Sequence, residues 1–202
     1  MADSRRVVNF PAMLKWLFGS RAAGAARGED SVWMNHAARL KGVSREVGTL
    51  AEADRSVLVV ALTLAALDEL EAALAPLQPV RCADTFARDA LRSGLSRAGA
   101  VAVALSGALS ADLKPTPDAS LDILVYGRNE SRAADEAIVQ FADALGPNTH
   151  IGFHLSLEDP LLQTFAGSLK PLLEKLGMRE DEPIAHAMVT RAIRNAQEKN
   201  EG

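Results

Sequence analysis

Three side chains near residue 155 have the types found in a nucleophilic catalytic triad. They are His154, Ser156 and Asp159, and they stand at the end of a short apolar run. A triad needs its histidine within hydrogen-bond reach of the nucleophile, and a serine nucleophile of an α/β enzyme sits on a tight turn flanked by glycines. His154 and Ser156 lie two apart on one predicted strand, and no glycine neighbours the serine. The spacing does not favour hydrolysis by this group.

Metal-ligating residue types occur in the same region without the spacing of a metal site. His150, His154 and Glu158 are not placed on one face by any predicted helix, and His36 stands alone on another element. A structural or catalytic metal needs three or four converging ligands. Cys82 is the single cysteine, which excludes an internal disulfide, and we expect it to be a small buried side chain. The sequence predicts no metal and no cofactor.

Phosphate chemistry would need groups that the 202 residues do not contain. No G-x-x-x-x-G-K-[ST] segment occurs, and no predicted strand ends in paired carboxylates. Lys114, Arg128 and Arg132 follow predicted strands, near the edge where parallel sheets bind ligands. These three are the weak candidates for an anion site.

The composition is that of a globular protein. Hydrophobic residues make up 48% and charged residues 24%, and the net charge is −4, so no basic field favours nucleic acid. No apolar run approaches the roughly 20 residues that cross a bilayer. The N-terminus lacks the apolar core and cleavage site of a secretory signal. We therefore expect a cytoplasmic protein.

Residues 1–28 form a basic segment with an amphipathic pattern. The apolar residues of a predicted short helix recur at helical spacing and end before Gly19: Phe10, Met13, Leu14, Leu17 and Phe18, with Trp16 between them. A basic amphipathic helix of this kind lies on an anionic membrane surface or docks on a partner. The alternative is that its apolar stripe packs on the core of the protein itself.

The remainder predicts an α/β fold with a mostly parallel sheet. After a linker at residues 21–30 and a helix capped by Ser31, apolar strand-like runs alternate with helical patterns. The predicted strands are 57–62, 79–82, 100–105, 121–126 and 151–155; the predicted helices are 31–53, 63–77, 84–98, 131–145, 160–166, 168–176 and 184–199. Ser156 and Asp159 are expected to cap each other where the last strand meets a helix.

The residues from 130 to 197 carry a resemblance to a known family. In order and spacing they resemble the end of the second nucleotide-binding domain of the SecA preprotein translocase ATPase family and the start of its helical scaffold. Asp135, Thr190 and Gln197 are among the shared residues, which are 130–132, 135, 155–159, 176–178, 182–184, 189–190, 192–193 and 196–197. Looser similarity extends upstream to about residue 55, and Phe18-Gly19-Ser20 is similar to the end of the family's N-terminal helix.

The resemblance implies a RecA-like fold but also shows which residues are missing. The family's arginine-rich segment corresponds to residues 139–144, where Val139, Phe141 and Ala144 replace three arginines. Its glycine-rich loop corresponds to residues 109–112, of which only Asp112 is similar. Arginines of this kind stabilise charge on a transferring phosphoryl group, and losing one commonly costs orders of magnitude in rate. The chain therefore resembles a degenerate ATPase domain, and Val139 and Phe141 are expected to make that edge apolar.

Two functions follow as hypotheses. The first is a non-catalytic SecA-like domain that acts through protein–protein contacts in export, with SecA, a translocon component, an export substrate or a second copy as partner. Its contact candidates are residues 7–18, Val139 and Phe141. The alternative is a ligand- or nucleotide-binding module that keeps the RecA-like cleft without hydrolysis. The expected organisation is a basic segment (1–28), a helix (29–54), the α/β domain (55–160) and a helical tail (161–202).

Overall fold

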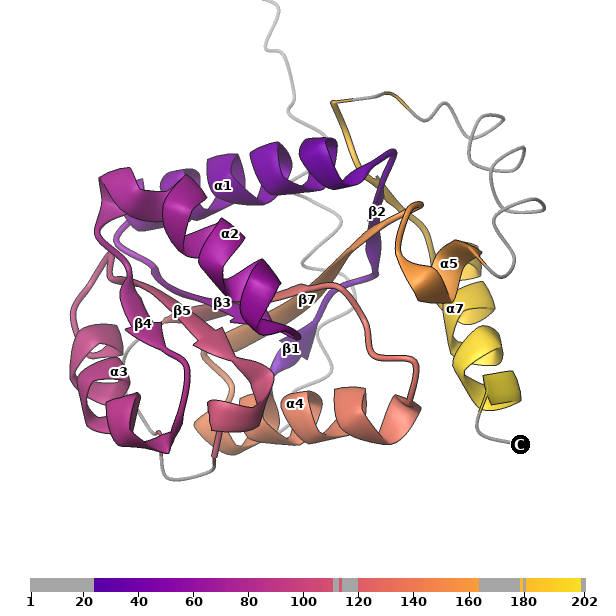
Figure 1. Ribbon diagram of the computed structural model, residues 1–202. Helices are drawn as coiled ribbons and strands as arrows, with labels where there is room; N and C mark the ends of the chain where they lie inside the picture. The colour runs from indigo at the N-terminus through magenta and orange to yellow at the C-terminus, as the bar shows by residue number, and fades with distance from the viewer. Residues whose placement is uncertain (1–23, 111–112, 114–119, 164–178, 180, 201–202) are drawn as a thin grey trace, which may run out of the picture.

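The computed structural model describes residues 24–110, 113, 120–163, 179 and 181–200. It contains the expected α/β domain, built on one mostly parallel sheet with helices on both faces (Figure 1). The strands are β1 (Ala26–Arg27), β2 (Ser31–Trp33), β3 (Ser56–Ala61), β4 (Val80–Cys82), β5 (Val101–Leu105), β6 (Leu121–Tyr126), β7 (Thr149–Ser156) and β8 (Ile184–Ala185). Their order is β4-β5-β3-β6-β7-β2-β8, with β1 also paired to β7.

Helices cover both faces of the sheet. They are α1 (His36–Glu52), α2 (Leu64–Leu74), α3 (Arg88–Leu95), α4 (Arg132–Leu145), α5 (Pro160–Gln163) and α7 (Ala187–Asn200), with 3-10 turns η2 (Ala75–Leu77), η3 (Thr85–Ala87) and η4 (Ser106–Ala108). On β3, Val57 and Val59 pack with α1 and α2, whereas Leu58 and Val60 belong to the core shared with α3 and α4. Both faces of β3 are therefore buried, which explains its unbroken apolar sequence.

The strands predicted from apolar runs are confirmed to within two residues at either end. All described strand pairs are parallel except β2 with β8. The predicted cap of α2 is also confirmed, because Thr63 Oγ1 accepts a hydrogen bond from the backbone nitrogen of Ala66 at 3.2 Å. Cys82 is fully buried, as expected, and burial raises the pKa of its thiol.

The predictions for residues 21–53 were partly wrong. Ser31 does not cap a helix: it begins strand β2, which pairs with β7, and the helix starts at His36 with Asn35 as its cap. Part of the predicted linker forms β1 beside the same strand. Val32 and Trp33 fit both a helical and a strand pattern, and the long neighbouring strand β7 decides in favour of pairing because it supplies backbone partners.

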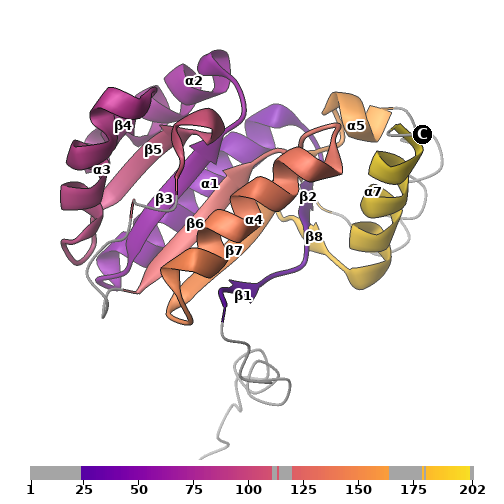
Figure 2. The ribbon, with the colours of Figure 1, turned by 90° about the horizontal axis from the view of Figure 1, so that it is seen from below.

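The predicted tail also needs correction. Ile184 and Ala185 form β8 antiparallel to β2, so the helix predicted over 184–199 does not start at Ile184, and α7 begins only at Ala187. Figure 2 shows α7 beside α5 at the β2–β8 end of the sheet. The predictions for residues 1–23, for Asp112 and Lys114, and for the helix at 168–176 lie outside the described residues. Within the described ranges, no helix combines the length and apolar character that a bilayer crossing requires.

Candidate functional site

Arg128 lies between two buried carboxylates where β6 leads into α4. Its Nη2 donates to Asp30 Oδ1 at 2.6 Å and its Nη1 to Asp135 Oδ2 at 3.0 Å. The guanidinium also stacks on the ring of Phe153, 3.8 Å from the centroid. The Arg128 side chain is only 9% exposed. Arg128 is therefore held by the fold on all sides, and the expectation that it offers an open anion site is wrong.

The same network ties helix α7 to the sheet. Gln197 Nε2 donates to Asp135 Oδ2 at 2.6 Å and to the carbonyl oxygen of Asn129 at 2.8 Å. Thr190, about two turns earlier on α7, accepts through its Oγ1 a hydrogen bond from the backbone nitrogen of Asp30 at 3.0 Å. Asp135, Thr190 and Gln197 are all residues that carry the family resemblance. What they build here is a joint between α4, the sheet edge and α7.

Burial shifts the protonation of Asp30. The carboxyl is 1% exposed, and its Oδ2 has no hydrogen-bond partner within the described residues. Desolvation raises the pKa of Asp30 above its usual range, and the neighbouring Arg128 opposes that rise without cancelling it. The joint thus contains one carboxylate that is costly to ionise.

A second buried ion pair fixes the turn after β7. Arg39 Nη1 donates to both oxygens of Asp159, at 2.9 and 2.8 Å, and its guanidinium stacks on Tyr126. The expected reciprocal caps are present: Glu158 donates its backbone N–H to Ser156 Oγ at 3.0 Å, and Ser156 donates its own to Asp159 Oδ2 at 2.9 Å. They close a turn that precedes α5, since that helix begins at Pro160.

The contacts of His154, Ser156 and Asp159 show that these three residues do not form a catalytic triad. His154 is 4% exposed and its Nδ1 lies 3.5 Å from Nε1 of Trp33, its donor. Desolvation lowers the pKa of His154 to about 4.

The histidines considered as metal ligands do not converge. The Nδ1 of His150 lies 2.9 Å from Nη2 of Arg55. Among the described residues, no group of three histidine, cysteine or acidic side chains is placed to hold a metal.

A cavity of about 410 Å³ lies at the carboxyl ends of β5 and β6, the edge where parallel sheets bind ligands. Its described lining comes from η4 and the residues after it, from Asn129, and from the first turns of α4. None of these side chains is charged; they are Ser106, Gly107, Leu109, Ser110, Asn129, Ala134, Ala137, Ile138, Gln140 and Phe141. Arginine or lysine side chains, which bind phosphates, are absent from this described lining.

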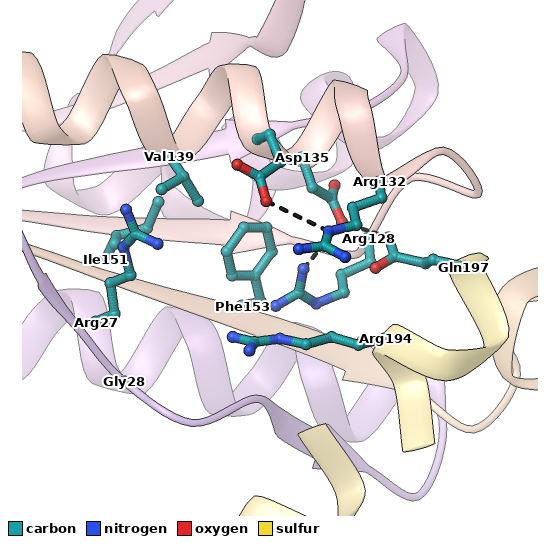
Figure 3. A pocket seen from close by; sticks show the side chains of 11 residues that line it. Arg27, Gly28, Arg128, Arg132, Asp135, Val139, Ile151, Phe153, Arg194 and Gln197 are labelled. Carbon is teal, nitrogen blue, oxygen red and sulfur yellow. Dashed lines mark hydrogen bonds and ion pairs between the residues drawn. The ribbon is translucent and has the colours of Figure 1, made fainter. Parts of the chain in front are cut away.

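A second cavity, of about 140 Å³, lies on the other side of α4, facing β1 and α7 (Figure 3). It is rich in arginine: Arg27, Arg128, Arg132 and Arg194 line it, and none of its residues lines the larger cavity. Arg128 and Arg132 were expected to lie near each other. Arg27 and Arg194 were missed, because side chains from opposite ends of a chain leave no mark in its local pattern.

Val139 and Phe141 do not form one apolar edge. Phe141 is 6% exposed in the core and lines the larger cavity, whereas Val139 is partly buried and lines the smaller one. Residues two apart on a helix point in nearly opposite directions, because one turn takes 3.6 residues. The expectation that Val139 and Phe141 share one apolar edge was therefore wrong.

The exposed large apolar side chains of the described residues lie elsewhere, and they include Leu77 and Met188 as well as two at one edge of the sheet. Phe86, in η3 after β4, is 93% exposed, and Leu64, at the start of α2, is 56% exposed. Both follow the carboxyl end of a strand and so lie at the same edge of the sheet as the larger cavity. The sequence analysis did not single out Phe86, although a lone aromatic within the mostly polar segment 84–89 was a signal for it.

Comparison with known proteins finds SecA repeatedly. The protein translocase subunit SecA of Desulfotalea psychrophila is 34% identical over 183 residues, which are 86% of this chain and 22% of that protein. The SecA of Syntrophobacter fumaroxidans is 29% identical over 182 residues, 85% of this chain. The chain thus resembles SecA over most of its own length and spans about a fifth of the length of these relatives. No protein-family model matches it.

Solved structures include distant likenesses. The C-terminal part of the Fun30 ATPase domain aligns with a TM-score of 0.47 at 12% identity, covering 81% of this chain and 54% of that one.

Proposed function

We propose that this SecA-related chain is a non-catalytic domain that works through protein–protein contacts as an accessory or regulator in protein export. The observation that carries the proposal is the uncharged described lining of the cavity at the strand ends. Transferring a phosphoryl group needs positive groups aimed at the developing charge. In this chain, the positions that correspond to the arginines of the SecA family hold Val139, Phe141 and Ala144. Arg128 already forms ion pairs with Asp30 and Asp135.

The retained residues support the same proposal. Asp135, Thr190 and Gln197 hold α7 against the sheet, and Asp159 holds the turn after β7 through Arg39. These contacts stabilise a scaffold and need no nucleotide. A domain that keeps its scaffold while losing its phosphate-binding groups is expected to present surfaces rather than to catalyse.

We place the contact surface at the carboxyl edge of the sheet and in residues 7–18. Phe86, at 93% exposure, is the side chain best suited to anchor a partner, because aromatic anchors dominate the binding energy of many interfaces.

The proposed partners are SecA itself, a translocon component, an exported protein or a second copy of this chain. With a net charge of −4, nucleic acid is not among them. The proposed location is the cytoplasm, at the periphery of the inner membrane.

The first test is nucleotide binding and turnover. The purified chain, titrated calorimetrically with ATP and magnesium, is expected to show no micromolar affinity and no phosphate release, whereas a full-length SecA measured in parallel provides the positive control. Micromolar binding, or magnesium-dependent turnover, would overturn the non-catalytic assignment.

The second test addresses the contact surface. Phe86→Ser is expected to weaken capture of SecA or translocon components by the tagged chain, because it removes an exposed anchor without opening a core cavity. Leu77→Ser is the matched control: Leu77 is also exposed, at 38%, but lies in η2 before β4, at the opposite edge of the sheet. Equal capture by both variants would exclude Phe86 from the interface. Deleting residues 1–20 tests the N-terminal segment in the same assay.

A ligand-binding module is the second candidate, favoured by the size of the larger cavity. Its volume of about 410 Å³ falls in the range of roughly 300–1,000 Å³ that small-molecule sites occupy. Its neutral polar groups, including Asn129 and Gln140, suit an uncharged ligand rather than a nucleotide. Mass spectrometry of the native purified protein would reveal such a ligand.

A further inference from the structure

The smaller cavity is built from parts of the chain that are far apart in sequence. Arg27 comes from β1, Arg132 from α4 and Arg194 from α7, and the floor between them is apolar, made of Val139, Ile151 and Phe153. Figure 3 shows Arg194 reaching from α7 towards the β1 side of the cavity. The whole chain has a net charge of −4, so this group of arginines is a local concentration of positive charge on an acidic protein.

The arginines differ in how strongly the fold holds them. Arg128 is locked by buried carboxylates and supplies a fixed wall. Arg27 pairs with Asp143 at 2.6 Å and Arg132 with Glu198 at 2.9 Å, both in half-exposed pairs that contribute little and can exchange partners. Arg194 is exposed and has no hydrogen bond or ion pair to any described residue; its charge is felt by Asp30.

Two carboxylates also line the cavity, and the negative charge of each is offset by a neighbouring arginine. Both oxygens of Asp135 are occupied by hydrogen bonds from Arg128, Asn129 and Gln197. Glu136 is half-exposed and lies 3.4 Å from Arg132, so it is able to turn towards solvent.

Size restricts the ligand further. A volume of about 140 Å³ is close to that of an engineered cavity, about 150 Å³, that holds one benzene molecule, and it is below the range of whole-nucleotide sites. We propose that this cavity binds a single phosphate group, with Arg194, Arg27 and Arg132 as its ligands. Several guanidinium forks approaching from different sides match the tetrahedral, doubly charged oxyanion better than a planar carboxylate.

Calorimetric titration at low ionic strength tests the site, with inorganic phosphate and glycerol phosphate as separate probes. The wild-type chain is expected to bind phosphate at one site, and Arg194→Gln to bind it about tenfold more weakly or worse, the loss expected for one charge-assisted contact. Arg191→Gln is the matched control, since Arg191 is exposed on the same helix but does not line the cavity. It is expected to bind like wild type.

The two probes separate the sources of the ligand. Tighter binding of glycerol phosphate would assign the site to an organic phosphate, and equal or tighter binding of inorganic phosphate to the free ion. Absence of saturable binding of both, or an equal loss in Arg191→Gln and Arg194→Gln, would overturn the proposal. Since the two cavities share no lining residue, that result would leave the proposed contact function untouched.

Discussion

Gln197 donates a 2.6 Å hydrogen bond to Asp135 across 62 positions of sequence, and both side chains are buried. One end of the bond belongs to the α/β domain and the other to the helix that follows it. Asp135, Thr190 and Gln197, which are among the residues that carry the resemblance to SecA, all join elements in this way. The chain therefore keeps the contacts that hold its tail in place.

Replacing Gln197 by alanine should weaken that joint. The change removes the bonds to Asp135 and to the carbonyl of Asn129, and we expect it to lower the free energy of unfolding by about 1–3 kcal/mol. Asn195→Ala, at an exposed position of the same helix, should change it by less than about 0.5 kcal/mol. Urea denaturation of the two variants measures both. Similar losses in both would mean that helix propensity, and not the buried bond, decides the effect.

Gly42 should not tolerate a side chain. A Cβ added there would overlap the ring of Trp33, which is 2% exposed, whereas a Cβ on Gly48 of the same helix would meet no atom within 4 Å. We expect Gly42→Ala to destabilise the protein by about 1–3 kcal/mol through overpacking. Gly48→Ala should stabilise it by about 0.5–1 kcal/mol through helix propensity. Thermal unfolding compares them, and two changes of the same sign would refute the packing of Trp33 on α1.

His154 should make the fold sensitive to acid. Its pKa is about 4 when folded, against 6.5 for an ordinary histidine, so between these values the unfolded chain binds a proton that the folded one does not. Stability from this group is thus present above pH 6.5 and falls as pH drops towards 4, by up to about 3 kcal/mol. Unfolding free energies at pH 7 and 4.5 should show a smaller loss in His154→Gln than in wild type. His150→Gln, at a half-exposed position, should keep the wild-type loss.

Asp30 should make the folded state less stable as pH rises, which is opposite to the effect of His154. Its folded pKa is raised above the usual 3.8, so the folded state holds the proton to higher pH than the unfolded one. The contribution of Asp30 is therefore greatest below pH 3.8 and declines as pH rises through the folded pKa. The difference in unfolding free energy between wild type and Asp30→Asn should shrink from pH 3.5 to pH 7. A difference that grows over this range would show that Arg128 outweighs desolvation.

Helices and strands were predicted correctly from the sequence where the local pattern of residues fitted only one type of element. The apolar run of β3 and the cap at Thr63 are confirmed because buried parallel strands and helix starts have strong local signals. Residues 31–33 had two interpretations. Strand β7 lies more than a hundred positions away, and pairing with it is not visible in the local pattern.

The candidate sites were less predictable. Arg128 follows a strand end, as an anion-binding arginine would, but Asp30 and Asp135 neutralise it from positions 98 and 7 residues away. Phe141 was predicted to belong to an apolar contact edge, but the direction of α4 turns its side chain into the core. Arg27 and Arg194 carried no sequence signal, yet they line one cavity.

The amino-acid sequence alone determined the α/β fold class and the similarity to SecA, since both are carried by patterns of neighbouring residues. Only the tertiary structure decided which charges are neutralised, which apolar side chains are exposed and which arginines converge. Those properties depend on distances between segments that lie far apart along the chain, and a distance of that kind is fixed by packing of the whole sheet and its helices.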